Sequence, residues 1–317
     1  CCCRNGRSIR PMAALVVGCA LLAGPVASAL PAYAVPQKSG TNTPVPDEPG
    51  AVPKGLESFY SQEVSWYPCG DSGGIQKTDE QGKFSCATVT VPMDYSQPDG
   101  KTIQVAVKKR AADGESRGSL FINPGGPGGS GISLVEAVGK SFSKDLLAGY
   151  DVVGFDPRGV GSSTPITCQD AKPAEEASAE QPQEESSFEN WAQGYMDEVS
   201  KLEKQCREHS EPGLLDHVGT ASVARDLDVL RAVSGEKSLN YLGFSYGTEL
   251  GYTYAELFPE NAGRLVLDGA MDSTSTNHRL TVETTEGYEK ALHRYVQACL
   301  EGKAGDNCPL TDDVEHG

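Results

Sequence analysis

The stretch Leu239–Thr248 (LNYLGFSYGT) decides the fold, because it sets the spacing Gly-x-Ser-x-Gly between an apolar run and a helix-forming run. A sharp turn from strand to helix projects a serine hydroxyl above the sheet, and it leaves no room for large neighbours. Gly243 and Gly247 satisfy that requirement on either side of Ser245. A helix that begins at Tyr246 also directs its positive end to the same point. We therefore predict that Ser245 is a nucleophile, with an ordinary turn serine as the alternative.

Further short apolar runs indicate the sheet around this turn. Such runs, separated by helical stretches, are typical of parallel strands buried on both faces. A helix is predicted from Thr220, with a stop at Gly235. The runs lie at Ser119–Asn123, Tyr150–Phe155, Leu239–Phe244 and Arg264–Leu267.

Two earlier runs have a different pattern. Phe84–Val91 and Thr102–Lys109 alternate apolar and polar residues, and Pro98–Gly100 supplies a turn between them. This pattern predicts a pair of antiparallel strands with one face toward solvent.

A glycine-rich loop, Pro124–Gly131 (PGGPGGSG), follows the first apolar run. Such a loop can present bare backbone N–H groups to a developing oxyanion. A phosphate loop is the alternative chemistry, but the Walker spacing is missing and Pro127 removes one donor. A plain structural turn is the third interpretation. We predict an oxyanion hole formed by one amide of the loop, Gly126 or Gly125, and the amide of Tyr246.

Three segments together resemble a known family. They are Asn123–Gly131 (NPGGPGGSG), Tyr150–Ser163 (YDVVGFDPRGVGSS) and residues 224–272, which contain the serine turn. Their order is similar to that of the α/β-hydrolase fold, and in particular to the secreted tripeptidyl-aminopeptidase and proline-iminopeptidase group of actinobacterial serine peptidases. The resemblance covers roughly residues 60–275. It implies an α/β fold with a mostly parallel sheet and helices on both faces.

The resemblance also implies a reaction: hydrolysis of short peptides from a free N-terminus through an acyl-enzyme, with no metal or organic cofactor. Ser245 matches the family's nucleophile, and Gly125 and Gly126 match its oxyanion loop. The segment with Asp156, Arg158 and Gly159 matches a loop expected to brace the floor of the site.

Glu249 is a candidate for substrate binding, because it lies one helical turn after Ser245 and an exopeptidase needs an anionic partner for the substrate's ammonium group. A solvated or paired helix residue is the more ordinary interpretation of this glutamate.

The acid and histidine of a catalytic triad follow the serine in this fold. Asp268 and Asp272 are the nearest carboxylates, and a turn or capping role fits them better. The histidines His278, His293 and His316 are expected on helices or at the surface. We expect the acid, the histidine and the last strands of the fold beyond Gly317, so that this chain is the N-terminal portion of a hydrolase.

Composition excludes several classes of protein. With 38% hydrophobic and 22% charged residues, the chain is neither a disordered protein nor a fibre. Lys+Arg 27 against Asp+Glu 44 gives a formal charge of −17. Such a charge repels nucleic acids and anionic membranes. The expected partner is the peptide substrate that the resemblance implies. The oligomeric state stays open.

The first 34 residues have the order of an export signal: three arginines, an apolar run and small residues at possible cleavage sites. We predict a secreted protein with no retained membrane span. Lipid attachment at Cys19 is the minor alternative. The expected organisation is a signal at 1–34, a linker at 35–53, a hydrolase core at 54–275 with an acidic insertion at 169–191, and the start of a helical lid at 276–317.

Six cysteines remain after the export signal, and an exported chain favours disulfides. Neighbour pairing is predicted, because each bond then closes a local loop. Zinc is the other interpretation, but no two of the six have the C-x2-C spacing. The predicted pairs are Cys69–Cys86, Cys168–Cys206 and Cys299–Cys308.

Two other functions remain open. The same serine turn serves carboxylesterases and lipases, and hydrolysis of an ester but not of a peptide anilide would favour them. A truncated, inactive relative that acts as a binding protein is the alternative from another class, because neither a clear acid nor a clear histidine is in sight.

Overall fold

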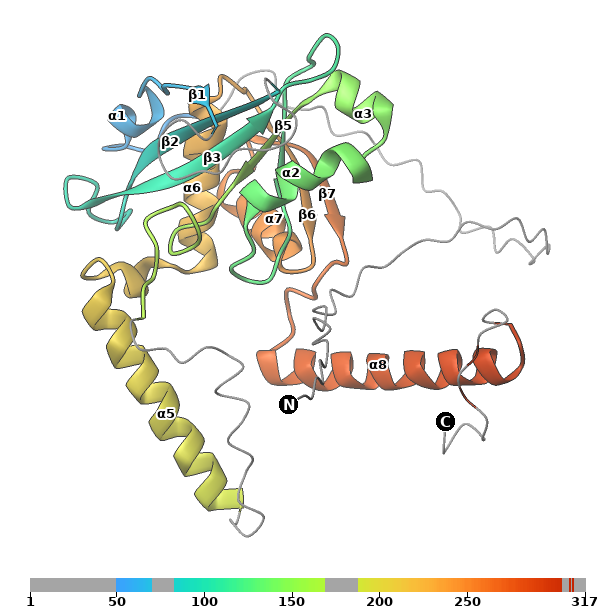
Figure 1. The fold of residues 1–317 in the computed structure, drawn as a ribbon. Coiled ribbons are helices and arrows are strands. Elements are labelled where there is room, and N and C mark those ends of the chain that lie inside the picture. The colour runs from blue at the N-terminus through green and yellow to red at the C-terminus, as the bar shows by residue number, and fades with distance from the viewer. Residues whose placement is uncertain (1–49, 70–82, 169–187, 304–307, 309, 311–317) are drawn as a thin grey trace, which may run out of the picture. The chain divides into compact units, whose positions relative to one another are not determined.

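The structure, a computed structural model, describes residues 50–69, 83–168, 188–303, 308 and 310 (Figure 1). The predicted export signal at 1–34 lies outside these residues, as does most of the predicted linker at 35–53.

The described strands form one mixed sheet in the order β1-β2-β3-β5-β4-β6-β7 (Figure 1). Neighbours are parallel from β5 through β4 and β6 to β7, and antiparallel from β1 through β2 and β3 to β5. The predicted strands are all present, with boundaries within two residues. Their bounds are β1 Tyr67–Pro68, β2 Phe84–Pro92, β3 Thr102–Arg110, β4 Ser119–Asn123, β5 Asp151–Phe155, β6 Leu239–Phe244 and β7 Ala262–Asp268.

Helices cover both faces of the sheet, so the predicted fold class is confirmed. On one face, α1 (Glu57–Tyr60), α6 (Thr220–Val233) and α7 (Tyr246–Leu257) pack on a core that includes Phe121 and Tyr241. On the other, α2 (Gly131–Ser141) and α3 (Lys144–Gly149) enclose a second core.

The predicted wet face of β2 and β3 holds only in part, because Thr88, Thr102 and Gln104 are exposed whereas two basic residues of β3 are buried. The Lys108 side chain is 0% exposed and pairs with Glu136 of α2, and Arg110 is 2% exposed beside Asp113. The basic residues at the C-terminal end of β3 are therefore buried in ion pairs. The alternation of apolar and polar residues does not show that helix α2 covers this end of the sheet and supplies a carboxylate to Lys108.

Helices α5 and α8 are the longest among the described residues. Helix α5 spans Phe188–His209, so residues 188–191 are helical although they were expected in the acidic insertion. Helix α8 spans Asn277–Leu300, where Thr276 caps the first turn by accepting from the Arg279 N–H at 3.2 Å. Between α5 and α6, the 3-10 turn η1 spans Leu214–His217. No helix among the described residues is long and apolar enough to cross a membrane.

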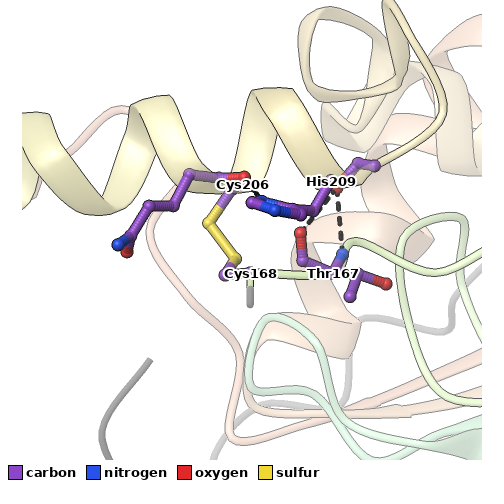
Figure 2. Close-up of a disulfide and its surroundings, with 6 residues drawn as sticks. Thr167, Cys168, Cys206 and His209 are labelled. Carbon is purple, nitrogen blue, oxygen red and sulfur yellow. Dashed lines mark hydrogen bonds between the residues drawn. A yellow bond between two sulfur atoms is a disulfide. The ribbon is translucent and has the colours of Figure 1, made fainter. Parts of the chain in front are cut away.

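The three predicted disulfides are present: Cys69–Cys86, Cys168–Cys206 and Cys299–Cys308. Figure 2 shows the second, which joins Cys206 on α5 to Cys168 beside Thr167. Hydrogen bonds support the same junction, because the Thr167 N–H donates to Ser210 Oγ at 2.9 Å and that hydroxyl donates to the Thr167 carbonyl at 3.2 Å. The last turn of α5 is thus fixed to the end of the loop that follows β5.

Candidate active site

Ser245 lies on the turn between β6 and α7, as the motif predicts. Among the described residues it is the non-glycine residue with a positive φ, at 53° with ψ −121°, and it is exposed. A Cβ on Gly243 would lie 2.3 Å from the Gly247 carbonyl oxygen, and one on Gly247 would lie 2.9 Å from that of Asn123. The glycines of the motif therefore do prevent collisions in a strained turn.

The glycine-rich loop after β4 lies against this turn. A Cβ built on Gly125 would meet the Phe244 carbonyl oxygen at 2.4 Å, and it would lie 3.1 Å from both Ser245 Cβ and the Tyr246 nitrogen. Segments more than a hundred residues apart in the sequence are thus in backbone contact. Both parallel strands, β4 and β6, end at this same edge of the sheet.

The two candidate loop amides are not equivalent. The Gly125 N–H donates to Asn123 Oδ1 at 2.8 Å, and Asn123 is buried. The Gly126 N–H forms no hydrogen bond with another described residue. The Tyr246 N–H belongs to the first turn of α7, where no intrahelical acceptor exists. Gly126 and Tyr246 therefore remain as candidate oxyanion donors, whereas the Gly125 amide is already engaged.

Asp156 fixes this loop to the one that follows β5. It is 2% exposed; it accepts from the Ser130 hydroxyl at 2.5 Å and from the Ser162 N–H at 2.9 Å. Ser130 is also the N-cap of α2, at the end of the glycine-rich loop. The expected bracing role of Asp156 agrees with these contacts.

Arg158 holds the loop that follows β5 against helix α6. Its five N–H groups all donate, and the strongest partner is Asp226 of α6, with Nη2–Oδ1 at 2.6 Å and Nε–Oδ2 at 2.8 Å. The other acceptors are the carbonyl oxygens of Pro92, Met93 and His217. Both side chains are almost fully buried, which makes this a structural ion pair with no donor left for a ligand.

Glu249, the candidate partner of a substrate amine, is half-buried. Its Oε1 accepts from Thr220 Oγ1 at 3.1 Å, and Thr220 Oγ1 also lies 2.7 Å from the Tyr246 hydroxyl. Burial raises the pKa of that hydroxyl above its ordinary value, so Tyr246 stays neutral. The Thr220 contact was not predicted, because it joins helices α6 and α7 and leaves no local signal in the sequence.

Neither candidate acid is in a triad within the described residues. The Asp268 side chain is exposed, and only its backbone oxygen meets the turn, accepting from the Ser245 N–H at 2.9 Å. The Asp272 carboxylate accepts from the Thr274 side chain at 2.7 Å and from its N–H at 2.8 Å. These bonds lower the pKa of Asp272, and they give it the predicted turn role.

No described histidine is hydrogen-bonded to Ser245. His278 is exposed on α8, and His293 pairs with Glu289 of the same helix at 3.1 Å. Both agree with the expected surface positions, whereas His316 lies outside the described residues.

Comparison with known proteins gives one family and several relatives. Residues 118–307 match the model of the alpha/beta hydrolase fold family. The chain is 39% identical over 258 residues to "Serine protease Hip1" of Mycobacterium tuberculosis, covering 81% of this chain and 48% of that protein. It is 41% identical over 214 residues to "Tripeptidyl aminopeptidase" of Streptomyces lividans, covering 66% and 38%.

A third relative carries a different name. "Carboxylesterase B" of Mycobacterium tuberculosis is 36% identical over 308 residues, covering 96% of this chain and 56% of that protein. The chain thus spans about half the length of the curated relatives it matches.

Proposed function

The chain belongs to the α/β-hydrolase fold family, and we propose that the protein is a secreted serine peptidase that releases short peptides from a free N-terminus through an acyl-enzyme on Ser245. One observation carries the proposal. An exposed serine lies in a strained turn against which the glycine-rich loop packs, and the Gly126 and Tyr246 amides that flank this contact have no acceptor among the described residues.

In the proposed reaction, Ser245 Oγ loses its proton to a histidine base and attacks the carbonyl carbon of the substrate. The carbonyl oxygen gains negative charge and accepts from the Gly126 and Tyr246 amides. The amine leaves with the proton, and water then releases the acyl group from Ser245. We propose that the histidine and its acid belong to parts of the protein other than the described residues.

The peptidase assignment draws support from the names of two relatives, "Serine protease Hip1" and "Tripeptidyl aminopeptidase". For the free N-terminus, Glu249 is the proposed anionic partner, since it lies one helical turn from Ser245 and its carboxylate accepts from the Thr220 hydroxyl. Export is proposed from the signal-like order of residues 1–34 and from three disulfides, which form in oxidising compartments.

An esterase is the second candidate, and the relative named "Carboxylesterase B" favours it because the match covers 96% of this chain. The same turn and amides serve either reaction, since both pass through an acyl-serine. The two differ in the leaving group and in whether a free amine is required.

A pair of substrates separates these candidates. The complete protein is assayed with Ala-Ala-Leu p-nitroanilide, with its N-acetylated form, and with p-nitrophenyl acetate, and Ser245→Ala is the control. We expect cleavage of the free tripeptide anilide and a loss of at least about tenfold on acetylation. Hydrolysis of the ester alone would favour the esterase, and no hydrolysis by a folded protein would favour an inactive binding protein.

A further inference from the structure

A cavity of about 340 Å³ lies beside the serine turn, on the side of helices α6 and α7. Its size falls at the lower end of small-molecule pockets, which run from about 300 to 1,000 Å³. Most of its wall is apolar. The side chains that form this part are those of Pro127, Val160, Ile166, Val218, Val223 and Leu250.

The cavity adjoins both candidate oxyanion donors. Tyr246, whose amide is one donor, lines it, and so do Pro127 and Gly128, which directly follow the other donor, Gly126. A carbonyl oxygen held between these amides would fix its carbon at Ser245. A substituent on that carbon then lies next to the mouth of the cavity.

Among the described residues of the wall, the charged side chain and the side-chain oxygen of Asn123 are already engaged. The Arg158 guanidinium donates all its N–H groups to protein acceptors, and Asn123 Oδ1 accepts from Gly125. Among the described residues of the wall there is no carboxylate or imidazole. A charged group would therefore be buried there without a partner, which is costly, and a departing amine would find no proton donor.

We propose that this cavity receives the side chain of the residue directly before the scissile bond, and that it selects an aliphatic or aromatic side chain there. The inference rests on the proposed peptidase function, because it places the acyl part of the substrate at Ser245. Apolar burial supplies the preference, and the engaged Arg158 removes any selection for an acidic side chain.

The test compares the complete protein with its Val160→Phe variant, in which a larger side chain fills the cavity. The substrates are Ala-Ala-Leu and Ala-Ala-Gly p-nitroanilides. We expect the wild-type protein to prefer the leucine substrate, and Val160→Phe to lower the Leu/Gly ratio of kcat/KM about tenfold or more. Val266→Phe is the matched control, because Val266 is 57% exposed on β7 outside the cavity, and it should leave the ratio unchanged.

A second variant guards against a misfolded protein. Ile166→Ala enlarges the cavity, so it should shift the preference from leucine toward phenylalanine. A wild-type protein with no preference for apolar residues, or a Val160→Phe ratio equal to that of Val266→Phe, would overturn the assignment of this cavity.

Product binding separates this inference from the proposed function. Calorimetry measures Ala-Ala-Leu and Ala-Ala-Gly on the Ser245→Ala protein, with and without Val160→Phe. Tighter binding of Ala-Ala-Leu that Val160→Phe abolishes would uphold the cavity even if no anilide were hydrolysed. Hydrolysis without any leucine preference would uphold the peptidase and reject the cavity.

Discussion

Ser245 adopts a backbone conformation that residues with a side chain rarely hold. Its φ of 53° is combined with a ψ of −121°, and the turn is fixed by the Ser245 N–H bond to the Asp268 carbonyl at 2.9 Å. Such conformations cost about 1–3 kcal/mol each, and they persist where the surrounding structure enforces them.

Relief of this strain is a measurable consequence. Ser245→Gly and Ser245→Ala both remove the hydroxyl, but only glycine tolerates the turn without steric cost. We expect the free energy of unfolding of Ser245→Gly to exceed that of Ser245→Ala by about 1 kcal/mol, measured by chemical denaturation with the disulfides intact. Equal stability of the two variants would show that the turn stores no strain.

Gly125 offers a second test at the residue scale, with Gly128 as its matched control. Both have a similar positive φ, 90° and 87°, so alanine strains the backbone equally at either position. A Cβ at Gly125 would collide with the Phe244 carbonyl, whereas one at Gly128 would meet nothing within 4 Å. We expect Gly125→Ala to lower kcat about 10²-fold or more through displaced oxyanion donors, and Gly128→Ala to stay within about tenfold of the wild type. Equal losses of kcat in the two variants would contradict a catalytic role for the contact between the loop and the turn.

The sequence predicted this turn because Gly-x-Ser-x-Gly is a local pattern between a strand and a helix. It left the choice between Gly125 and Gly126 open. That choice depends on the Asn123 side chain, which folds back onto the Gly125 N–H. Which N–H group a side-chain oxygen accepts from depends on the tertiary structure, and no spacing in the sequence shows it.

At the scale of elements, the buried pair Arg158–Asp226 ties the loop after β5 to helix α6. The Arg158 side chain is 0% exposed and that of Asp226 is 1% exposed, and the Tyr95 hydroxyl also donates to Asp226 at 2.8 Å. Removal of one partner leaves a buried charge without compensation.

We therefore expect Asp226→Ala to reduce the free energy of unfolding by about 3–5 kcal/mol in chemical denaturation. The double variant Arg158→Met/Asp226→Leu should recover most of that loss, since it removes both charges together. A single variant within about 1 kcal/mol of the wild type would contradict a structural role for the pair.

The elements themselves were largely predictable. Buried parallel strands appear in the sequence as short apolar runs, and the bounds of β4 and β6 are the same as those of the predicted runs. Helix starts were less predictable, since α5 begins at Phe188, inside the segment that was expected as an acidic insertion. The expected wet face of β3 failed only in the C-terminal half of the strand, where Lys108 pairs with Glu136 on a helix that the alternation could not reveal.

At the scale of the whole molecule, four parallel strands place the glycine-rich loop, the β5 loop and Ser245 at one edge of the sheet. The ordered motifs predicted the α/β-hydrolase fold family, and the match over residues 118–307 confirms this family. The catalytic base could not be predicted from the sequence, because the histidine of a triad meets its serine only in the folded structure. The described histidines His278 and His293 are at the surface of α8.

Covalent labelling tests most directly whether this turn carries a working nucleophile. The complete protein is treated with a fluorophosphonate, and the modified peptide is identified by mass spectrometry. Labelling at Ser245 that is lost in Ser245→Ala, greatly slowed in Gly125→Ala and retained in Gly128→Ala is the predicted result. Labelling that persists in Ser245→Ala, or a folded protein that takes no label, would contradict it.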